Sequence, residues 1–263
     1  MIYNAYKSTD SSHLIEAFFE LKVLKSSLPF EGKVLPLGKH SMAYTCKGMH
    51  KLTVENKIYN AKGLIVTGQT KKTSLLNIDQ ETKCCGIVFH PTTLYKLTQL
   101  DVSIINDKHI ALSEFSKPLC NTLNIFFAKK LKGNEALKAL ETLIKKQPLT
   151  INNHTDNVDK ALAIINQKAG QISINDLLEK IPVSQKTLET KFKLMVGLTP
   201  KKYARLHRFN MLIKKYNEKE LKLKDIVEMY NFHDASHFAK EFKYFMNQSP
   251  KTYSENKNEF IKI

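Results

Sequence analysis

Apolar and polar positions along the chain change their pattern at Pro91. Between residues 14 and 90 the apolar positions form short runs bounded by glycine or proline, such as Gly63–Gly68 and Cys84–Phe89. Short, branched, apolar runs are typical of buried strands. The polar tip Glu55–Lys57 predicts a hairpin turn. Several such strands in succession predict a small antiparallel barrel or sandwich.

After Pro91 the apolar positions take a helical spacing. One short helix is predicted over Thr92–Leu100, and apolar residues recur every three or four positions from Phe115 to Leu131 and again over Glu135–Lys146. These helices are expected to pack against the sheet. The Phe126–Phe127 pair fits a core stripe or a dimer seam, and the sequence leaves both open.

Residues 147–156 are polar and without periodicity, as a linker is expected to be. We therefore predict a β-rich domain with two or three packed helices at 1–150, a linker at 151–156 and an all-helical domain at 157–263. The predicted fold class is α+β, with two domains.

Helix signals fill the second half of the chain. Thr155–Asp156 is expected to cap a first helix, Ser173 with Asp176 has the spacing of a capping box, and Ser184 is expected to cap a third helix beyond the break at Pro182. Two short helices across a tight turn are typical of a helix-turn-helix unit.

A longer helix follows, with Thr199 as its cap and Pro200 in its first turn, and it runs to about Tyr216, roughly 25 Å. Shorter helices are predicted at about Lys224–Tyr230 and from Asp234, and a last helix begins at Ser249–Pro250.

The second half contains an internal repeat with an offset of 50 residues. Leu188, Phe192 and Lys193 recur as Phe238, Phe242 and Lys243, and Gly197–Pro200 with Tyr203 recurs as Asn247–Pro250 with Tyr253. A fixed offset indicates duplicated structural units. The domain is therefore predicted to hold two helix-turn-helix units joined by a helical spacer, an arrangement that can place two recognition helices about 34 Å apart, in successive major grooves.

The formal net charge of +16 favours an anionic partner such as nucleic acid, although a lysine-rich solvated surface has the same composition. The excess is spread over both halves of the chain, so charge alone does not locate a DNA site. No apolar run reaches the ~18 residues of a membrane helix, and the first residues lack a signal-peptide pattern. A cytoplasmic protein without cofactor is expected. The cysteines, including adjacent Cys84 and Cys85, fit small buried hydrophobes better than a redox or metal site.

The repeat carries a family resemblance. Residues 157–257 resemble the paired helix-turn-helix domain of the AraC/XylS family of bacterial transcription regulators. The matching positions are Leu177, Ser184, Leu188, Phe192, Lys193, Gly197–Pro200, Tyr203, Arg208, Asp225, Ile226, Phe232, Ser236, Phe238, Phe242, Lys243, Ser249, Pro250 and Tyr253.

The resemblance implies sequence-specific promoter binding by the third and sixth helices, with a separate N-terminal domain that senses a signal or dimerises. Residues 1–150 are similar to a β-rich domain of uncharacterised role found in some of these regulators, through Gly68 and Gly86–Pro91. Asn231 and Asn247 stand where the family usually has glycine, and asparagine tolerates the same left-handed turn. Thr190 stands where the first recognition helix often carries arginine, and Lys240 is its counterpart in the second.

The residues expected to face DNA lie opposite the apolar stripes of the two recognition helices. They are Gln185, Lys186, Glu189, Thr190 and Lys193 in the first, and Ala235, Ser236, Ala239, Lys240 and Lys243 in the second. Lys193 and Lys243 are expected to hold phosphates. An ordinary solvated helix face is the alternative for each residue. Arg208, Pro200 and Pro250 are assigned to structural support.

The only arginines, Arg205 and Arg208, lie in the connecting helix. The bidentate arginine–guanine contact is thus absent from both recognition helices, and specificity is expected to depend on lysine, methyl and hydroxyl contacts and on the shape of A·T-rich DNA.

Two other functions compete with DNA binding. His233 and His237 have a spacing that suits metal ligation, but no metalloprotease motif accompanies them, and an enzyme is not expected. The first half could instead be a small-molecule barrel that gates the helical domain, or a dimerisation module. The expected partner is double-stranded promoter DNA, with RNA polymerase, an unknown small-molecule effector and a second copy of the chain as further partners and no membrane. The sequence does not separate an activator from a repressor.

Overall fold

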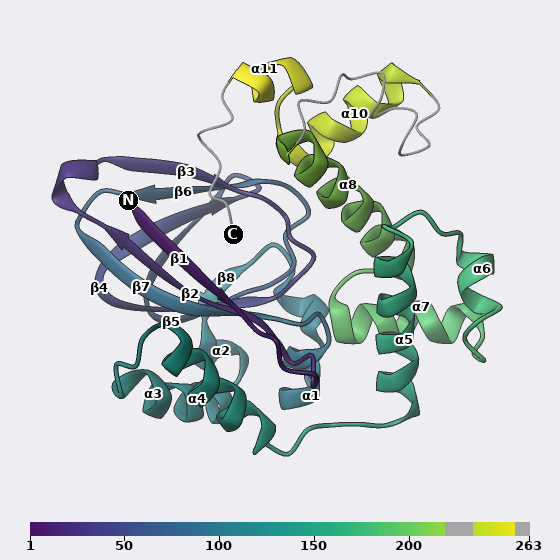
Figure 1. Ribbon diagram of the computed structural model, residues 1–263, viewed down its shortest axis with the longest axis horizontal. Coiled ribbons are helices and arrows are strands. Elements are labelled where there is room, and N and C mark those ends of the chain that lie inside the picture. Colours follow the sequence, from purple (N-terminus) through teal and green to yellow (C-terminus); the bar gives the residue numbers. More distant parts are fainter. Residues whose placement is uncertain (219–233, 256–263) are drawn as a thin grey trace.

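The computed structural model describes residues 1–218 and 234–255. Its N-terminal part is an antiparallel sheet with the strand order β1-β2-β7-β4-β5-β8, and β3 and β6 pair with each other beside β4 (Figure 1). The strands are β1 (Ile2–Lys7), β2 (Ile15–Val23), β3 (Phe30–Val34), β4 (Ser41–Val54), β5 (Lys57–Thr67), β6 (Ser74–Ile78), β7 (Thr82–Phe89) and β8 (His109–Ala111).

Strand β4 pairs with β5, β6 and β7, and it forms a long hairpin with β5. Its turn is at Glu55 and Asn56, whose backbone φ angles are +45° and +68°, which confirms the predicted turn. Both strands are longer than their apolar runs indicated, because pairing continues past the bulge between Thr45 and His50. Edge strand β1 was missed: it is mostly exposed, so it has no buried face to create a pattern.

Helices cover one face of the sheet (Figure 1). They are α1 (Thr93–Thr98), α2 (Leu112–Phe115), α3 (Lys117–Ala128) and α4 (Gly133–Lys145). Short 3-10 turns, η1 (Lys25–Ser27) and η2 (Val102–Ile105), lie in the connections after β2 and after α1. Phe126 and Phe127 are both buried, and the ring of Phe127 stacks on Tyr44 at 5.0 Å between centroids. The core interpretation of this pair is therefore confirmed. Burial also raises the pKa of the Cys84 and Cys85 thiols to about 12, which leaves them protonated and unreactive.

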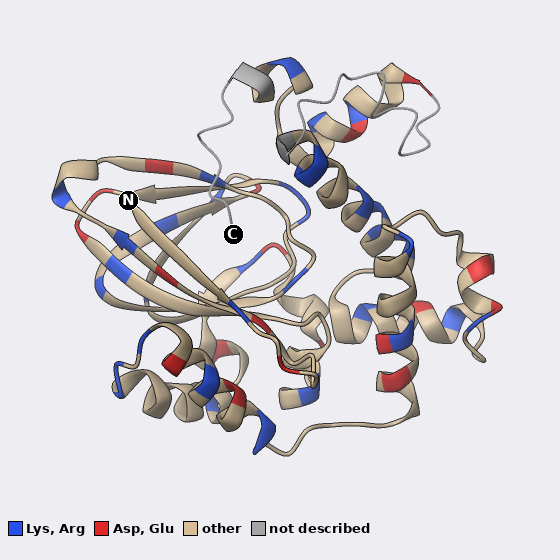
Figure 2. Cartoon of the chain, in the orientation of Figure 1, with Lys and Arg blue, Asp and Glu red and all other residues tan. Residues whose placement is uncertain are grey.

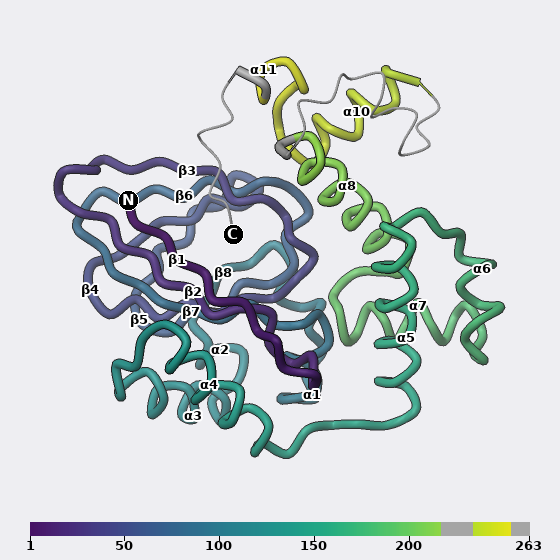
Figure 3. Tube along the Cα trace, viewed as in Figure 1, coloured from purple at the N-terminus to yellow at the C-terminus, as the bar shows by residue number. Residues whose placement is uncertain are grey.

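The helical part begins after an extended segment that leaves α4 and passes along the edge of the molecule (Figure 3). Its helices are α5 (Asn153–Gln167), α6 (Ile174–Leu178), α7 (Gln185–Val196), α8 (Pro200–Glu218), α10 (Ala235–Met246) and α11 (Pro250–Glu255). The predicted helix at 224–230 lies outside the described residues. The α+β class with a β-rich and a helical part is confirmed.

The start of α5 differs from the prediction. Its N-cap is Asn152, whose side chain accepts from the backbone N–H of Thr155, while the Thr155 hydroxyl accepts from the N–H of Asn152. Thr155 is thus the third residue of a capping box and not the cap itself. The helix consequently begins inside the predicted linker at 151–156.

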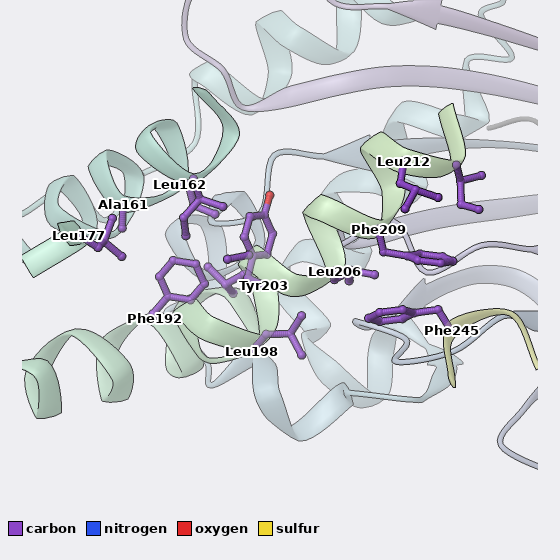
Figure 4. Packing of buried hydrophobic residues seen from close by; sticks show 14 of the residues in the cluster. Ala161, Leu162, Leu177, Phe192, Leu198, Tyr203, Leu206, Phe209, Leu212 and Phe245 are labelled. Carbon is purple, nitrogen blue, oxygen red and sulfur yellow. The ribbon is translucent and has the colours of Figure 1, made fainter. Parts of the chain in front are cut away.

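One core joins the two helix-turn-helix units through α8 (Figure 4). Tyr203 packs edge-to-face on Phe192 of α7, with 5.6 Å between centroids. Six residues further along α8, Phe209 stacks on Phe245 of α10, with 4.5 Å between ring centroids. The predicted apolar side of this helix, which includes Leu206 and Ile213 as well as Tyr203 and Phe209, is buried throughout. Among the described residues, no helix has the length and hydropathy that crossing a membrane requires.

Candidate nucleic-acid interface

The first recognition helix, α7, is fixed at both ends. The Ser184 hydroxyl accepts from the backbone N–H of Thr187 at 3.2 Å, as the predicted cap requires. Leu188 and Phe192 are buried in the shared core. The helix ends at Gly197, whose φ of +88° lies in the left-handed region that favours glycine.

The predicted DNA-facing residues of α7 lie together on its outer face. Gln185, Lys186, Thr190 and Lys193 are exposed, and Glu189 is half-buried. Gln185 Nε2 donates to Glu189 Oε1 at 2.8 Å. A base contact by either of these two side chains would therefore have to replace their mutual hydrogen bond.

The second recognition helix, α10, has the same construction. The Asp234 carboxylate accepts from the backbone N–H of His237 at 2.6 Å, which confirms the predicted cap, and Phe238, Phe242 and Phe245 are buried. Its outer face presents Ala235, Ser236, Lys240 and Lys243 as exposed residues and Ala239 as half-buried.

The helix ends repeat as well as the helix starts. Asn247 closes α10 with φ of +56°, the position that Gly197 occupies in α7. The expectation that asparagine supports this left-handed turn is confirmed for Asn247, while Asn231 lies outside the described residues. Pro200 and Pro250 are the first residues of α8 and α11, behind the capping hydroxyls of Thr199 and Ser249.

Both arginines of the chain bind one carboxylate on the second recognition helix. Arg208 Nη2 donates to Glu241 Oε1 at 3.2 Å, and Arg205 Nε lies 3.3 Å from Glu241 Oε2. Only 3% of the Glu241 side chain is exposed. The Arg205 guanidinium also lies over the ring of Tyr244, 4.7 Å from its centroid. The arginines thus connect α8, the helix between the two units, to α10.

The predicted histidine pair is only partly described, since His233 lies outside the described residues. His237 Nε2 is 3.8 Å from Glu241 Oε2. Within residues 1–218 and 234–255, no cluster of three or more His, Cys, Asp or Glu side chains has the arrangement of a metal site.

The β-rich part contacts the C-terminal ends of both recognition helices. At the end of α7, Asn106 Nδ2 donates to the Gly197 carbonyl at 2.6 Å. At the end of α10, the Thr73 N–H donates to the Phe245 carbonyl at 2.8 Å, and Asn247 Nδ2 donates to the Thr73 carbonyl at 3.2 Å. The β-rich part therefore binds the two units at repeat-equivalent positions.

The connecting helix is held by the same side of the molecule. Asn210 Nδ2 of α8 donates to the Pro36 carbonyl at 2.9 Å, in the segment between β3 and β4. Gly38 in that segment has φ of +72°, and a Cβ there would lie 3.2 Å from the Tyr203 ring. These interdomain contacts had no signal in the sequence, because Asn106, Thr73 and Pro36 belong to loops without periodicity.

Lysine and arginine are distributed over both parts of the chain and along α8 and α10 (Figure 2). This agrees with the even charge distribution in the sequence. The candidate interface is therefore distinguished by exposed helix faces and their caps rather than by one concentrated basic patch.

Comparison with known proteins places this geometry in context. The profile of a helix-turn-helix domain family matches residues 177–256, and that of a domain of unknown function, DUF6597, matches residues 9–111. The chain is 30% identical over 104 residues to "Probable transcription factor PqrA" of Proteus vulgaris, a match that covers 40% of this chain and 85% of that protein.

Among solved structures, ToxT from Vibrio cholerae aligns over 96% of this chain and 97% of its own, with 15% identity and a TM-score of 0.47. The unsaturated fatty acid-bound form of ToxT gives 15% identity and a TM-score of 0.46 over 96% of this chain and 94% of its own.

The relationship to PqrA extends over most of that protein, and the helix-turn-helix profile covers both α7 and α10. These matches fall on the repeated helices whose caps, cores and exposed faces are described above. The chain belongs to the AraC/XylS family of DNA-binding transcription regulators.

Proposed function

We propose that the protein reads a bipartite promoter site with the outer faces of α7 and α10. The observation that carries this proposal is that both faces are exposed while both helix ends are fixed by caps and by the β-rich part. Rigid support is what a recognition helix needs to hold side chains in register with base edges.

The base-reading residues proposed are Lys186, Glu189 and Thr190 in α7 and Ser236, Ala239 and Lys240 in α10. Gln185 and Ala235, at the helix starts, lie beside them. Lys193 and Lys243 stand nearer the helix ends, where a flexible ammonium group suits a phosphate better than a base.

We infer that the preferred site is A·T-rich. Both arginines are engaged with Glu241, so neither is available for the bidentate guanine contact. Lysine, hydroxyl and methyl groups are the remaining readers, and they are supplemented by DNA shape. Selection of binding sites from random DNA tests this inference, and strongly discriminated G-rich half-sites would contradict it.

The β-rich part is proposed to control the separation of the recognition helices. It contacts α7, α8 and α10 separately, so a change in its position changes the placement of both units on DNA. The double variant Asn106→Ala and Thr73→Val removes the Asn106 amide and the Thr73 hydroxyl, which also donates to the Phe245 carbonyl at 3.0 Å. Its DNA affinity tests this control. An affinity and a footprint equal to those of the unchanged protein would contradict it.

The alternative function, in which the interior of the β-rich barrel is the main binding site for a small-molecule effector, is less well supported because the cavity there is small. A cavity between its strands, lined by Phe19, Leu52 and Val88 among others, measures about 80 Å³. Small-molecule pockets typically measure ~300–1,000 Å³.

As a promoter-binding regulator the protein is proposed to act on RNA polymerase, and a second copy of the chain is a further candidate partner. Light scattering of the full chain with and without promoter DNA tests for the dimer. Transcription in vitro with purified RNA polymerase tests for an action on the polymerase.

The central experiment measures affinity for a selected site and for random DNA of equal length. Lys186→Ala together with Lys240→Ala should weaken binding to the selected site far more than binding to random DNA. Lys168→Gln, a change of an exposed lysine at the end of α5 that is not among the proposed DNA-facing residues, is the matched control. Equal losses on both DNAs would contradict base reading by these lysines.

A further inference from the structure

A cavity of about 520 Å³ lies between the β-rich part and the first helix of the DNA-binding part. One wall is α5. The other is formed by the loop between β1 and β2, the end of β7 and α1. Its size lies within the ~300–1,000 Å³ of typical small-molecule sites, and it includes none of the proposed DNA-facing residues.

An ion pair closes one side of this cavity. Lys96 Nζ lies 2.5 Å from Asp159 Oδ2, and the Thr92 hydroxyl donates to Asp159 Oδ1 at 2.6 Å. Both oxygens of the Asp159 carboxylate are therefore engaged, and the pair ties α1 to α5. A ligand therefore does not have to supply a hydrogen-bond donor or a positive charge to Asp159.

In the described part of the chain, Asp156 and Lys160, in contrast to Asp159, have charged groups that are not engaged in ion pairs. Both line the cavity and are exposed, and within residues 1–218 and 234–255 neither forms an ion pair. They stand four residues apart on one face of α5, so their positions are separated by roughly 6 Å along the helix axis. The wall therefore offers one unpaired negative and one unpaired positive group about one helical turn apart.

His90 supplies a polar group between the walls. Its Nδ1 atom is buried and has no hydrogen-bond partner among the described residues. Burial lowers the pKa of His90 against the opposing effect of Asp159, so the ring is neutral at neutral pH. Because Nδ1 has no accessible surface, a ligand in the cavity meets the His90 ring rather than this atom. The charges of the lining then balance, because Lys96 and Lys160 oppose Asp156 and Asp159.

We propose that this cavity binds a short zwitterion of the dipeptide class, with its ammonium group at Asp156, its carboxylate at Lys160 and its central amide beside the His90 ring. Two extended residues reach ~7 Å, which matches one helical turn. The charges of a single amino acid lie closer together than this. A ligand with one charge would leave Asp156 or Lys160 unpaired.

The cavity has walls from both parts of the chain, so a bound dipeptide stabilises their docked arrangement. This inference goes beyond the proposed function, and its test needs no DNA. A failure of dipeptide binding and a failure of promoter reading are therefore separate results.

In the first experiment, the full chain is mixed with each member of a panel of dipeptides that carry free termini. Calorimetry measures the binding affinity, and thermal unfolding measures the Tm. At least one member should raise the Tm. Its N-acetyl form and its C-terminal amide should each bind roughly tenfold more weakly, since each loses one charge-assisted contact. The proposal is overturned when no dipeptide shifts the Tm, or when blocked and free forms bind equally.

Two variants assign the ends of the ligand. Asp156→Asn should weaken the free dipeptide roughly tenfold and remove the penalty of N-acetylation, while Lys160→Gln should remove the penalty of amidation. Both residues are exposed, so the fold is expected to survive. Glu179→Gln and Lys168→Gln change exposed charges outside the cavity and should leave binding unchanged. Undiminished binding by Asp156→Asn and Lys160→Gln would overturn the proposal.

Discussion

Arg208 of the connecting helix and Glu241 of the second recognition helix form a buried hydrogen-bonded ion pair, with 3.2 Å between Arg208 Nη2 and Glu241 Oε1. Arg208 also lies at a close crossing: a Cβ on Gly170 at the end of α5 would be 2.6 Å from the Arg208 backbone nitrogen. Arg208, which belongs to the connecting helix, thus lies against the end of the first helix of the domain and also binds the second recognition helix.

Glu241→Ala should destabilise the helical part by about 1–3 kcal/mol, because the mostly covered Arg208 side chain, 20% exposed, loses its charge-assisted hydrogen bond. The measurement is the free energy of unfolding in urea, followed by a signal from the helical part. Glu179→Gln, an exposed change, should alter it by less than about 0.5 kcal/mol. A loss for Glu241→Ala as small as that of the control would show that the pair adds no stability.

Gly197→Ala should destabilise the protein for two reasons. Alanine is strained at φ of +88°, and its Cβ would lie 2.5 Å from Asn106 Oδ1 in the β-rich part. Gly63 separates the two effects, since it has φ of +72° with nothing within 4 Å of an added Cβ. Gly63→Ala should cost about 1–2 kcal/mol from the backbone alone.

The cost of Gly197→Ala should exceed that of Gly63→Ala in thermal or urea unfolding. Replacing Asn106 by alanine should then reduce the additional cost, because the clashing oxygen is removed. Equal losses of unfolding free energy at the two glycines would mean that Asn106 moves away from the added Cβ without a measurable loss of stability.

Lys240→Ala should weaken binding to the preferred DNA site by about 1–3 kcal/mol and relax discrimination at one base pair. Lys243→Ala should weaken binding to all sequences alike and reduce the slope of log affinity against log salt by about 1. Fluorescence anisotropy over a salt series measures both. Interchanged behaviour of the two lysines would reverse the proposed orientation of α10 in the groove.

The protein should lose stability as the pH falls from about 6.5 to about 4. His50 and His109 are buried with 3.1 Å between their Nε2 atoms, and burial lowers the pKa of His50 to about 4 and of His109 to about 3. Between these values and the unfolded pKa of about 6.5, the unfolded chain binds protons that the folded chain does not. Stability therefore rises with pH through this window and is complete above it.

Thermal unfolding between pH 4 and pH 8 measures this dependence. His109→Gln should reduce the slope, since it removes one of the two groups. His154→Gln, at the exposed start of α5, is the control for a change of histidine content. A slope that His109→Gln leaves intact would assign the acid sensitivity to other groups, such as buried His40, whose pKa burial also lowers to about 4.

Much of the helical part could be predicted because its signals are local. Ser184 and Asp234 cap helices by contacts within three residues, and the stripes of α7, α8 and α10 face one continuous core. The capping box of α5 shows the limit of such signals, since Asn152 and Thr155 are both competent caps and only the backbone geometry chose Asn152.

The sequence by itself determined two capped recognition helices, the helix between them and the exposed faces that qualify as a DNA interface, since repetition and helical spacing are properties of neighbouring residues. Only the tertiary structure decided that Glu241 forms ion pairs with both arginines and that Asn106 and Thr73 bind the ends of the recognition helices. It also decided that Asp156 and Lys160 line the same cavity as His90. These contacts join residues distant in the sequence, and no local pattern encodes them, because their partners are placed by the folding of the whole chain.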